Sequence, residues 1–163
     1  MISVVIPVYN EEKNLSLLMD RLEKVMKSLE RPYEIIFVDD GSRDRSLEIL
    51  KGFVGRPGVR VVELTRNYGQ HPAVFSGFSV VRGDVVVTLD ADLQNPPEEV
   101  PRLIQALEEG GYEVVGSVRQ FRRDSSFRKI PSLFVNAMTR RITGVPMTDW
   151  GCMLRAYRRE VVD

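Results

Sequence analysis

The chain has 163 residues, of which 43% are hydrophobic and 28% are charged, and its formal net charge is zero. This length suits one domain with a proper core, and the composition is ordinary for a soluble globular protein. No apolar run approaches the roughly 18 residues that a membrane-spanning helix needs, and no basic leader precedes the first apolar run. The single cysteine, Cys152, excludes an internal disulfide and fits a reducing compartment.

The charges are unevenly distributed along the chain. Residues 1–118 contain 13 basic and 19 acidic side chains, whereas residues 119–163 contain 10 and 4. The second segment therefore predicts a basic face for an anionic partner such as phosphate, lipid headgroups or nucleic acid. Because the sequence stops inside a charged segment with no terminating signal, we expect the chain to be a fragment of a longer protein.

Strand and helix patterns alternate along the first 118 residues. Short apolar runs predict strands at 2–8, 33–38, 59–64, 84–89 and 112–118. Helical spacing predicts helices at 11–29, from a cap at Ser42 or Asp44 to about residue 54, at 71–81, and from Val100 to the glycines at 110–111. This alternation predicts right-handed β-α-β units and an α/β fold with a mostly parallel central sheet flanked by helices.

Polar residues follow each predicted strand. They are Tyr9-Asn10-Glu11, Asp39-Asp40, Arg66-Asn67, Asp90 with Asp92, and Arg119. The carboxyl ends of parallel strands lie on one rim of a doubly wound sheet, which is where such sheets bind ligands. We therefore expect these side chains to converge on one site.

The stretch from Val85 to Glu98 is the most informative part of the chain. An apolar, β-branched run ends in Asp90 and Asp92, and a Pro-Pro-Glu follows. If the local backbone stays extended, both carboxylates point the same way and reach one hard cation. This spacing favours a divalent metal between two carboxylates and a diphosphate, although a bare Asp-X-Asp also occurs as an acidic turn that ends a strand. The longer string Asp-Ala-Asp-Leu-Gln-Asn-Pro-Pro-Glu is far more specific.

Several other nucleotide and metal motifs do not fit. Gly-X-Gly-X-X-Gly does not follow the first strand and the sequence has no P-loop, so neither a dinucleotide site nor a P-loop site is expected. An EF-hand loop starting at Asp90 needs glycine where Asn95 stands and glutamate where Pro101 stands. A haloacid-dehalogenase-type phosphatase has Thr or Val where this chain has Gln94.

Four further features are either ambiguous between two interpretations or expected to be purely structural. The segment Asp39-Asp40-Gly41-Ser42 either accepts hydrogen bonds from base or ribose donors or forms an Asp-Gly turn with a helix cap. His71, the one histidine, is expected to be structural, and Cys152 is expected to be a core residue. Residues 125–143 combine apolar residues at helical spacing with basic ones. They predict a helix, starting near Ile130, that lies at a membrane surface or packs on the core.

Four motifs together resemble the family-2 glycosyltransferases of GT-A fold and, within them, the polyprenyl-phosphate glycosyltransferases. They are Val-Ile-Pro-Val-Tyr-Asn-Glu-Glu at 5–12, Val-Asp-Asp-Gly-Ser at 38–42, Arg-Asn-Tyr-Gly-Gln-His at 66–71, and 90–98. The resemblance covers essentially all 163 residues. Segments 118–120, 127–129 and 149–159 are similar to the branch that transfers 4-deoxy-4-formamido-L-arabinose to undecaprenyl phosphate. Cys-Met-Leu-Arg at 152–155 departs from the Asp-Phe-Arg-Leu-like string of mannose and glucose transferases and favours that branch.

The resemblance implies a set of site residues. Nucleotide contacts fall on Pro7, Tyr9, Asn10, Glu11, Asp39, Asp40, Ser42, Asp90 and Ala91. Ligands for Mg²⁺ or Mn²⁺ fall on Asp90, Asp92 and Gln94. Contacts to the acceptor phosphate fall on Arg119, Arg128 and Ser132. Catalytic roles fall on Asp92 and on Asp149, the latter as a base or orienting carboxylate.

The resemblance also implies an activity and a location. We expect one catalytic domain over residues 1–163, with a nucleotide-sugar part at 1–118 and a basic part facing acceptor and membrane at 119–163. It would be a metal-dependent inverting enzyme that moves a sugar from a UDP-sugar donor to undecaprenyl phosphate. Its place would be the cytoplasmic face of the bacterial inner membrane, ahead of C-terminal transmembrane helices.

Other functions stay open at this point. They are transfer of glucose or mannose, a polysaccharide acceptor, a nucleotide-binding module without turnover, and a basic nucleic-acid binder. The lack of aromatic residues interleaved with the basic ones argues against nucleic-acid binding. The sequence is also compatible with a homo-oligomer.

Overall fold

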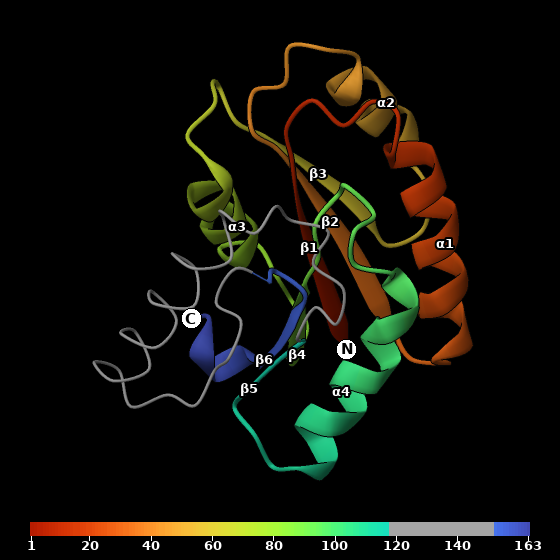
Figure 1. Cartoon of the computed structure of the whole chain (residues 1–163), viewed down its shortest axis with the longest axis vertical. Coiled ribbons are helices and arrows are strands. Elements are labelled where there is room, and N and C mark those ends of the chain that lie inside the picture. The colour runs from red at the N-terminus through yellow and green to blue at the C-terminus, as the bar shows by residue number, and fades with distance from the viewer. Residues whose placement is uncertain (118–151) are drawn as a thin grey trace, which may run out of the picture.

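The computed structural model describes residues 1–117 and 152–163. In the described residues a six-stranded sheet in the order β3-β2-β1-β4-β6-β5 lies between helices (Figure 1). The strands β1 (Ile2–Val8), β2 (Tyr33–Asp39), β3 (Val59–Glu63) and β4 (Val85–Thr88) are mutually parallel. The strands β5 (Val114–Gly116) and β6 (Arg155–Arg158) complete the sheet, and β6 runs antiparallel to both of its neighbours. The α/β fold with a mostly parallel sheet is confirmed.

Helices cover both faces of this sheet. The helices α1 (Leu15–Ser28), α2 (Ser46–Phe53) and α4 (Val100–Glu109) pack on one face, and α3 (Gln70–Phe78) packs on the other (Figure 1). Two short 3₁₀ turns, η1 (Pro97–Glu99) and η2 (Arg159–Val161), precede α4 and follow β6. None of the helices in residues 1–117 and 152–163 has both the length and the hydropathy that crossing a bilayer requires.

The core explains why these segments adopt these elements. Six of the seven residues of β1 are buried, as expected for a central parallel strand with helices on both faces. The larger apolar cluster joins β1, β2 and β4 to α1, α2 and α4, whereas the smaller one joins the sheet to α3. Helix α3 approaches β1 closely because Gly77 has no side chain: a Cβ there would lie 2.3 Å from Cγ1 of Val5.

The structure corrects several predicted boundaries. Helix α1 begins at Leu15 rather than at residue 11, whereas α2 begins at Ser46, whose backbone N–H donates to Oδ1 of Asp44, one of the two predicted caps, at 2.9 Å. The strand predicted at 112–118 is limited to Val114–Gly116. Strand β6 was not predicted, because its short Arg-Ala-Tyr-Arg sequence becomes a strand through pairing with β4 and β5 rather than through any apolar alternation.

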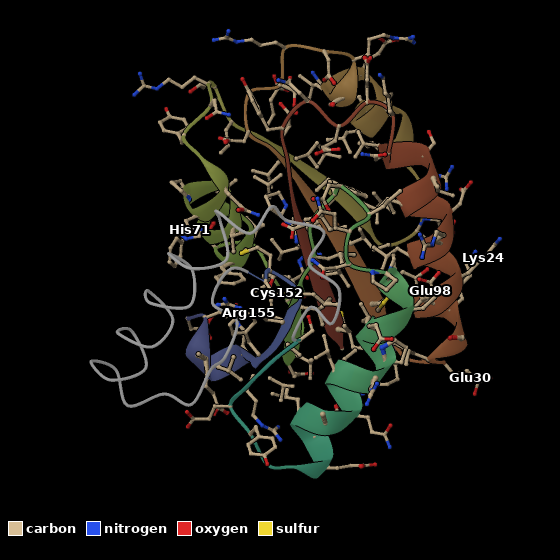
Figure 2. The ribbon with its side chains drawn as sticks, viewed as in Figure 1. Lys24, Glu30, His71, Glu98, Cys152 and Arg155 are labelled. Atoms are coloured by element: carbon tan, nitrogen blue, oxygen red, sulfur yellow. The ribbon has the colours of Figure 1, made fainter. Side chains whose placement is uncertain are left out.

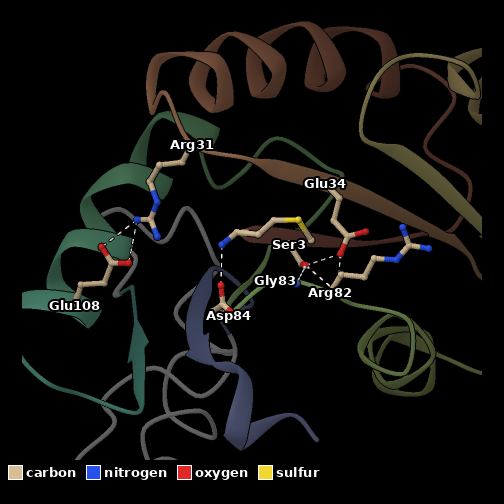
Figure 3. Close-up of polar contacts among 8 residues, drawn as sticks. Ser3, Arg31, Glu34, Arg82, Gly83, Asp84 and Glu108 are labelled. Carbon is tan, nitrogen blue, oxygen red and sulfur yellow. Dashed lines mark hydrogen bonds and ion pairs between the residues drawn. The ribbon is translucent and has the colours of Figure 1, made fainter.

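A buried polar network joins the amino-terminal ends of the central strands (Figure 3). Glu34 on β2 is only 4% exposed, and its carboxylate accepts hydrogen bonds from Ser3 Oγ (2.6 Å), the Arg82 backbone N (2.7 Å) and Arg60 Nη1 (2.9 Å). Ser3 Oγ in turn accepts a hydrogen bond from the Gly83 backbone N at 2.8 Å. Burial by itself raises the pKa of Glu34, but these hydrogen bonds outweigh it and hold that pKa below its ordinary value.

The variant Glu34→Gln tests this network. We expect it to lower the free energy of unfolding by about 2 kcal/mol at neutral pH, because the amide keeps the shape but loses the charge that three donors bind. A carboxylate with a depressed folded pKa stabilises the fold above its unfolded pKa, and this stability is lost as pH falls through the folded pKa. The difference between wild type and variant should therefore shrink below about pH 4.5 in urea unfolding. A difference that is the same at neutral and acidic pH would contradict this account.

Candidate functional site

A cavity of about 260 Å³ lies at the carboxyl ends of the parallel strands. The residues that line it belong to the ends of β1 to β4 or to the loops that follow them: Pro7, Val8, Tyr9, Glu11, Asp40, Asn67, Gly69, Gln70, Asp90, Ala91 and Asp92. Strand order reverses between β1 and β4, and this crevice is where an open α/β sheet usually binds its ligand. The predicted convergence of polar residues on one rim is thus seen for these four strand ends.

The structure places the predicted site residues in three groups. Seven line the cavity: Pro7, Tyr9, Glu11, Asp40, Asp90, Ala91 and Asp92. Four lie close by in the chain but are not among the lining residues: Asn10, Asp39, Ser42 and Gln94. The last four, Arg119, Arg128, Ser132 and Asp149, lie outside the described residues and stay predictions. Asn67 lines the cavity, as its place after the third predicted strand led us to expect, whereas sequence reasoning assigned no role to Val8, Gly69 and Gln70, although the last two belong to the motif at 66–71.

The two carboxylates after β4 share the cavity but are held in different ways. Gln70 Nε2 donates to Asp90 Oδ1 at 2.6 Å, and Asn95 Nδ2 donates to Asp90 Oδ2 at 3.3 Å. Asp92 Oδ1 accepts the backbone N–H of Gln94 at 2.9 Å. The backbone turns at Ala91 and Asp92 instead of continuing the extended strand. The extended geometry expected for the two aspartates is therefore wrong, yet both still reach one cavity.

The donor set at this point fits a hard divalent cation that arrives with a phosphate ligand. Within residues 1–117 and 152–163, no three acidic, histidine or cysteine side chains gather as a complete metal site. Mg²⁺ is usually held by one or two carboxylates, with waters and substrate phosphates filling its other positions. Asp90 and Asp92 supply two such carboxylates, so Mg²⁺ or Mn²⁺ with a diphosphate matches the chemistry of the site.

Asp40 holds the 66–69 loop, which leads into α3 and forms one wall of the cavity. Its side chain is 2% exposed, and its two oxygens accept the backbone N–H groups of Tyr68 (2.8 Å) and Gly69 (2.9 Å). Gly41 follows with φ +66°, and a Cβ there would lie 2.5 Å from the backbone carbon of Arg66. The carboxylate and the missing side chain together bring the 66–69 loop against the end of β2.

Asp39 differs from its neighbour because successive residues of a strand point to opposite faces of the sheet. It is 1% exposed, and its Oδ2 accepts the backbone N–H of Ser42 at 3.1 Å. Its Oδ1 is buried and has no hydrogen-bond partner among the described residues. An unpaired buried oxygen costs about 1–3 kcal/mol, and such groups call for a donor from a ligand, water or ion.

The loops after β1 and β2 are bound to each other. The Asn10 backbone N donates to Ser42 Oγ (3.1 Å), and the Arg43 backbone N donates to Asn10 Oδ1 (2.8 Å). Ser46 Oγ accepts the Glu11 backbone N–H at 2.8 Å. Asn10 and Ser42 therefore connect the two loops.

The sequence singled out two further residues, His71 and Cys152, which are both labelled in Figure 2. His71 is exposed on α3 and does not line the cavity. Cys152 is 1% exposed just before β6, which confirms that it is a core residue. Its Sγ lies 3.0 Å from Ser117 Oγ and donates to Asn95 Oδ1 at 3.5 Å, so it packs directly beneath the loop that carries the two aspartates.

Comparison with known proteins identifies the family. Residues 3–163 match Glycosyl transferase family 2. The chain belongs to this family. It is 58% identical to the undecaprenyl-phosphate 4-deoxy-4-formamido-L-arabinose transferase of Pseudomonas paraeruginosa, over 100% of the chain and 48% of the relative. It is 56% identical to the Edwardsiella ictaluri enzyme of the same name, over 99% of the chain and 50% of the relative. The chain thus spans about half the length of these curated relatives.

Solved structures of other proteins share the fold. One is glucosyl-3-phosphoglycerate synthase from Mycobacterium tuberculosis in complex with Mn²⁺, UDP-glucose and phosphoglyceric acid. Its TM-score is 0.75 at 25% identity, and the match covers 99% of this chain and 57% of that one. The GT-A architecture that the family-2 motifs implied is confirmed.

The substitution Asp40→Asn tests how the 66–69 loop is held. An amide in place of the carboxylate turns an NH₂ group toward one of the two N–H donors, so we expect that hydrogen bond to be lost at a cost of about 1–3 kcal/mol. Amide hydrogen exchange at Tyr68 and Gly69 should then be faster than in wild type. The control Asp20→Asn, at an exposed carboxylate on α1, should leave both rates unchanged. Unchanged exchange in Asp40→Asn would contradict the assignment.

A second test concerns the close approach at Gly41. We expect Gly41→Ala to destabilise the protein by about 2 kcal/mol or more, because a left-handed backbone and the Arg66 backbone both oppose a Cβ. The matched control is Gly52→Ala on α2, where a Cβ meets nothing within 4 Å, and it should stabilise by about 0.5–1 kcal/mol. Chemical denaturation measures both, and equal midpoints for the two variants would refute the argument.

Proposed function

We propose that this chain is the catalytic part of a family-2 glycosyltransferase that moves a sugar from a UDP-sugar to undecaprenyl phosphate. The observation that carries the proposal is the shared cavity of Asp90, Asp92 and Tyr9, in a chain 58% identical to an enzyme named for transfer to undecaprenyl phosphate. The sugar that we propose is the one in that relative's name, 4-deoxy-4-formamido-L-arabinose.

The nucleotide would lie over the ends of β1 and β2. Pro7 and Tyr9 give the cavity an apolar and aromatic wall against which a base can pack. The buried, unpaired oxygen of Asp39 is an acceptor suited to an N–H or O–H donor of uridine. Asp40 would act indirectly, because both of its oxygens already bind the backbone of the 66–69 loop.

The diphosphate would lie beside the loop after β4. Asp90 and Asp92 would hold Mg²⁺ or Mn²⁺, which when bound neutralises the diphosphate and stabilises the departing UDP. Gln94 contributes its backbone N–H to Asp92 in this structure, so its proposed role as a ligand would need its exposed side chain to turn toward the cavity.

The acceptor is itself an anion, so its phosphate oxygen needs little deprotonation before it attacks. In a single inverting displacement this oxygen bonds to the anomeric carbon while the bond from that carbon to UDP breaks. Catalysis would therefore rest on positioning and on charge neutralisation. Arg119, Arg128 and Ser132 remain the proposed contacts of the lipid phosphate at the membrane surface, and Asp149 remains the proposed orienting carboxylate.

Calorimetric titration with UDP, and with GDP for comparison, tests the donor site with and without Mn²⁺. We expect binding that is selective for UDP and strengthened by Mn²⁺, and we expect Asp92→Asn to abolish the metal-dependent part, because one of two carboxylate ligands is lost. The control Asp84→Asn removes a carboxylate that pairs with the amino terminus at the opposite end of the sheet, and it should bind like wild type.

Either of two results would contradict the donor-site assignment: equal affinity with and without Mn²⁺, or wild-type behaviour of Asp92→Asn. Release of UDP that depends on added undecaprenyl phosphate separates a transferase from a nucleotide-binding module without turnover. That assay uses the full-length protein, because the chain spans half of the length of its relatives.

A further inference from the structure

The carboxylate of Asp90 lies between two side-chain amides that come from distant parts of the chain. Gln70, the first residue of α3, reaches one oxygen, and Asn95, in the loop before η1, reaches the other. We call Gln70 and Asn95 the amide pair. An amide donates without adding charge, so the amide pair can orient Asp90 while leaving its negative charge available to a cation.

Each member of the amide pair is itself fixed by a buried group. Asn95 is 4% exposed, and its Oδ1 accepts from the Cys152 thiol, whose sulfur also contacts Ser117 Oγ. Because Oδ1 is engaged by the thiol, the Nδ2 end of the same amide must face Asp90. The contact from a buried cysteine therefore sets the orientation of the Asn95 amide.

Gln70 is fixed from the other side of the cavity. Its backbone follows Gly69, whose N–H is bound by the buried carboxylate of Asp40. The side chain then crosses to Asp90 with a bond of 2.6 Å and also lines the cavity. Two hydrogen bonds, joined by the peptide bond between Gly69 and Gln70, thus connect Asp40 after β2 to the Asp90 carboxylate after β4.

We propose that Gln70 and Asn95 are positioning residues that hold the Asp90 carboxylate in the orientation that binds the metal–diphosphate group, with Cys152 setting the orientation of Asn95. This inference rests on the proposed function. Loss of either amide lets the carboxylate rotate, so the cost falls on metal-dependent nucleotide binding. Outer partners of metal ligands commonly change metal affinity by about 10- to 100-fold when they are removed.

The test is the affinity for UDP with and without Mn²⁺ in Gln70→Ala, Gln70→Met and Asn95→Ala, with thermal melting of each protein. We expect the dissociation constant with Mn²⁺ to rise about tenfold in both alanine variants, while the metal-free value stays at that of wild type. Gln70→Met keeps about the same side-chain length and removes the donor without adding a charge or a carboxylate ligand, so it should weaken binding about as much as Gln70→Ala.

A matched control is available on α4. Gln105 Nε2 donates to Glu109 Oε1 at 2.9 Å, an amide–carboxylate pair of the same kind that is exposed and outside the cavity. Gln105→Ala should change neither affinity nor melting. Cys152→Ala should raise the dissociation constant with Mn²⁺ in the same direction as Asn95→Ala but by a smaller factor, because the Asn95 amide remains.

The outcomes distinguish a failure of this proposal from a failure of the donor-site assignment. Wild-type affinity in Gln70→Met, or an equal loss of affinity with and without Mn²⁺ in both alanine variants, overturns the role of the amide pair and leaves the donor site standing. Absence of metal-dependent UDP binding in the unaltered protein overturns both. If Asn95→Ala does not fold, the exposed Gln70 decides the question, since its substitution removes no core contact.

Discussion

The parallel pairing of β1 with β2 on one side and with β4 on the other determines where everything else in the site lies. The register places Val8 opposite Asp39 and Val5 opposite Thr88, so three strands end within a few residues of one another. The polar side chains that follow these strands therefore meet over the end of β1. A cavity with polar walls on an apolar sheet is the direct result of that register.

Two sets of polar contacts keep this arrangement rigid at opposite ends of the sheet. The Glu34 network fixes the amino-terminal ends of the strands, while Asp40 and the contacts between the loops after β1 and β2 fix the carboxyl-terminal ends. Asn10 and Leu93 adopt left-handed backbone conformations in loops beside the cavity, with φ of 57° and 61°. Non-glycine residues in this region are uncommon and cluster at functional sites, where surrounding contacts hold them.

The sequence alone predicted most of the helices and strands, and it pointed to the two aspartates after β4 at the centre of the candidate site. Buried strands read as apolar runs, and the aspartates after β4 stand out because a carboxylate pair ends such a run. The difference between Asp39 and Asp40 was not readable, because it depends on which face each residue meets and on what packs there. Gln70 was missed for a similar reason: its partner lies 20 residues away, and only the folded chain brings the two together.

The position of β6 has a consequence for the order in which the protein becomes folded. Its residues pair with β4 across sequence separations of 67 to 73 residues, and Thr88 Oγ1 donates to the Met153 carbonyl oxygen at 2.5 Å. Until that distant segment arrives, β4 is an apolar edge strand with unpaired backbone groups, and such edges recruit other chains. Closing so long a loop is slow compared with forming the neighbouring β-α-β units. A ribosome that has not yet released residues 152–158 therefore carries a nascent chain whose most aggregation-prone edge is still open.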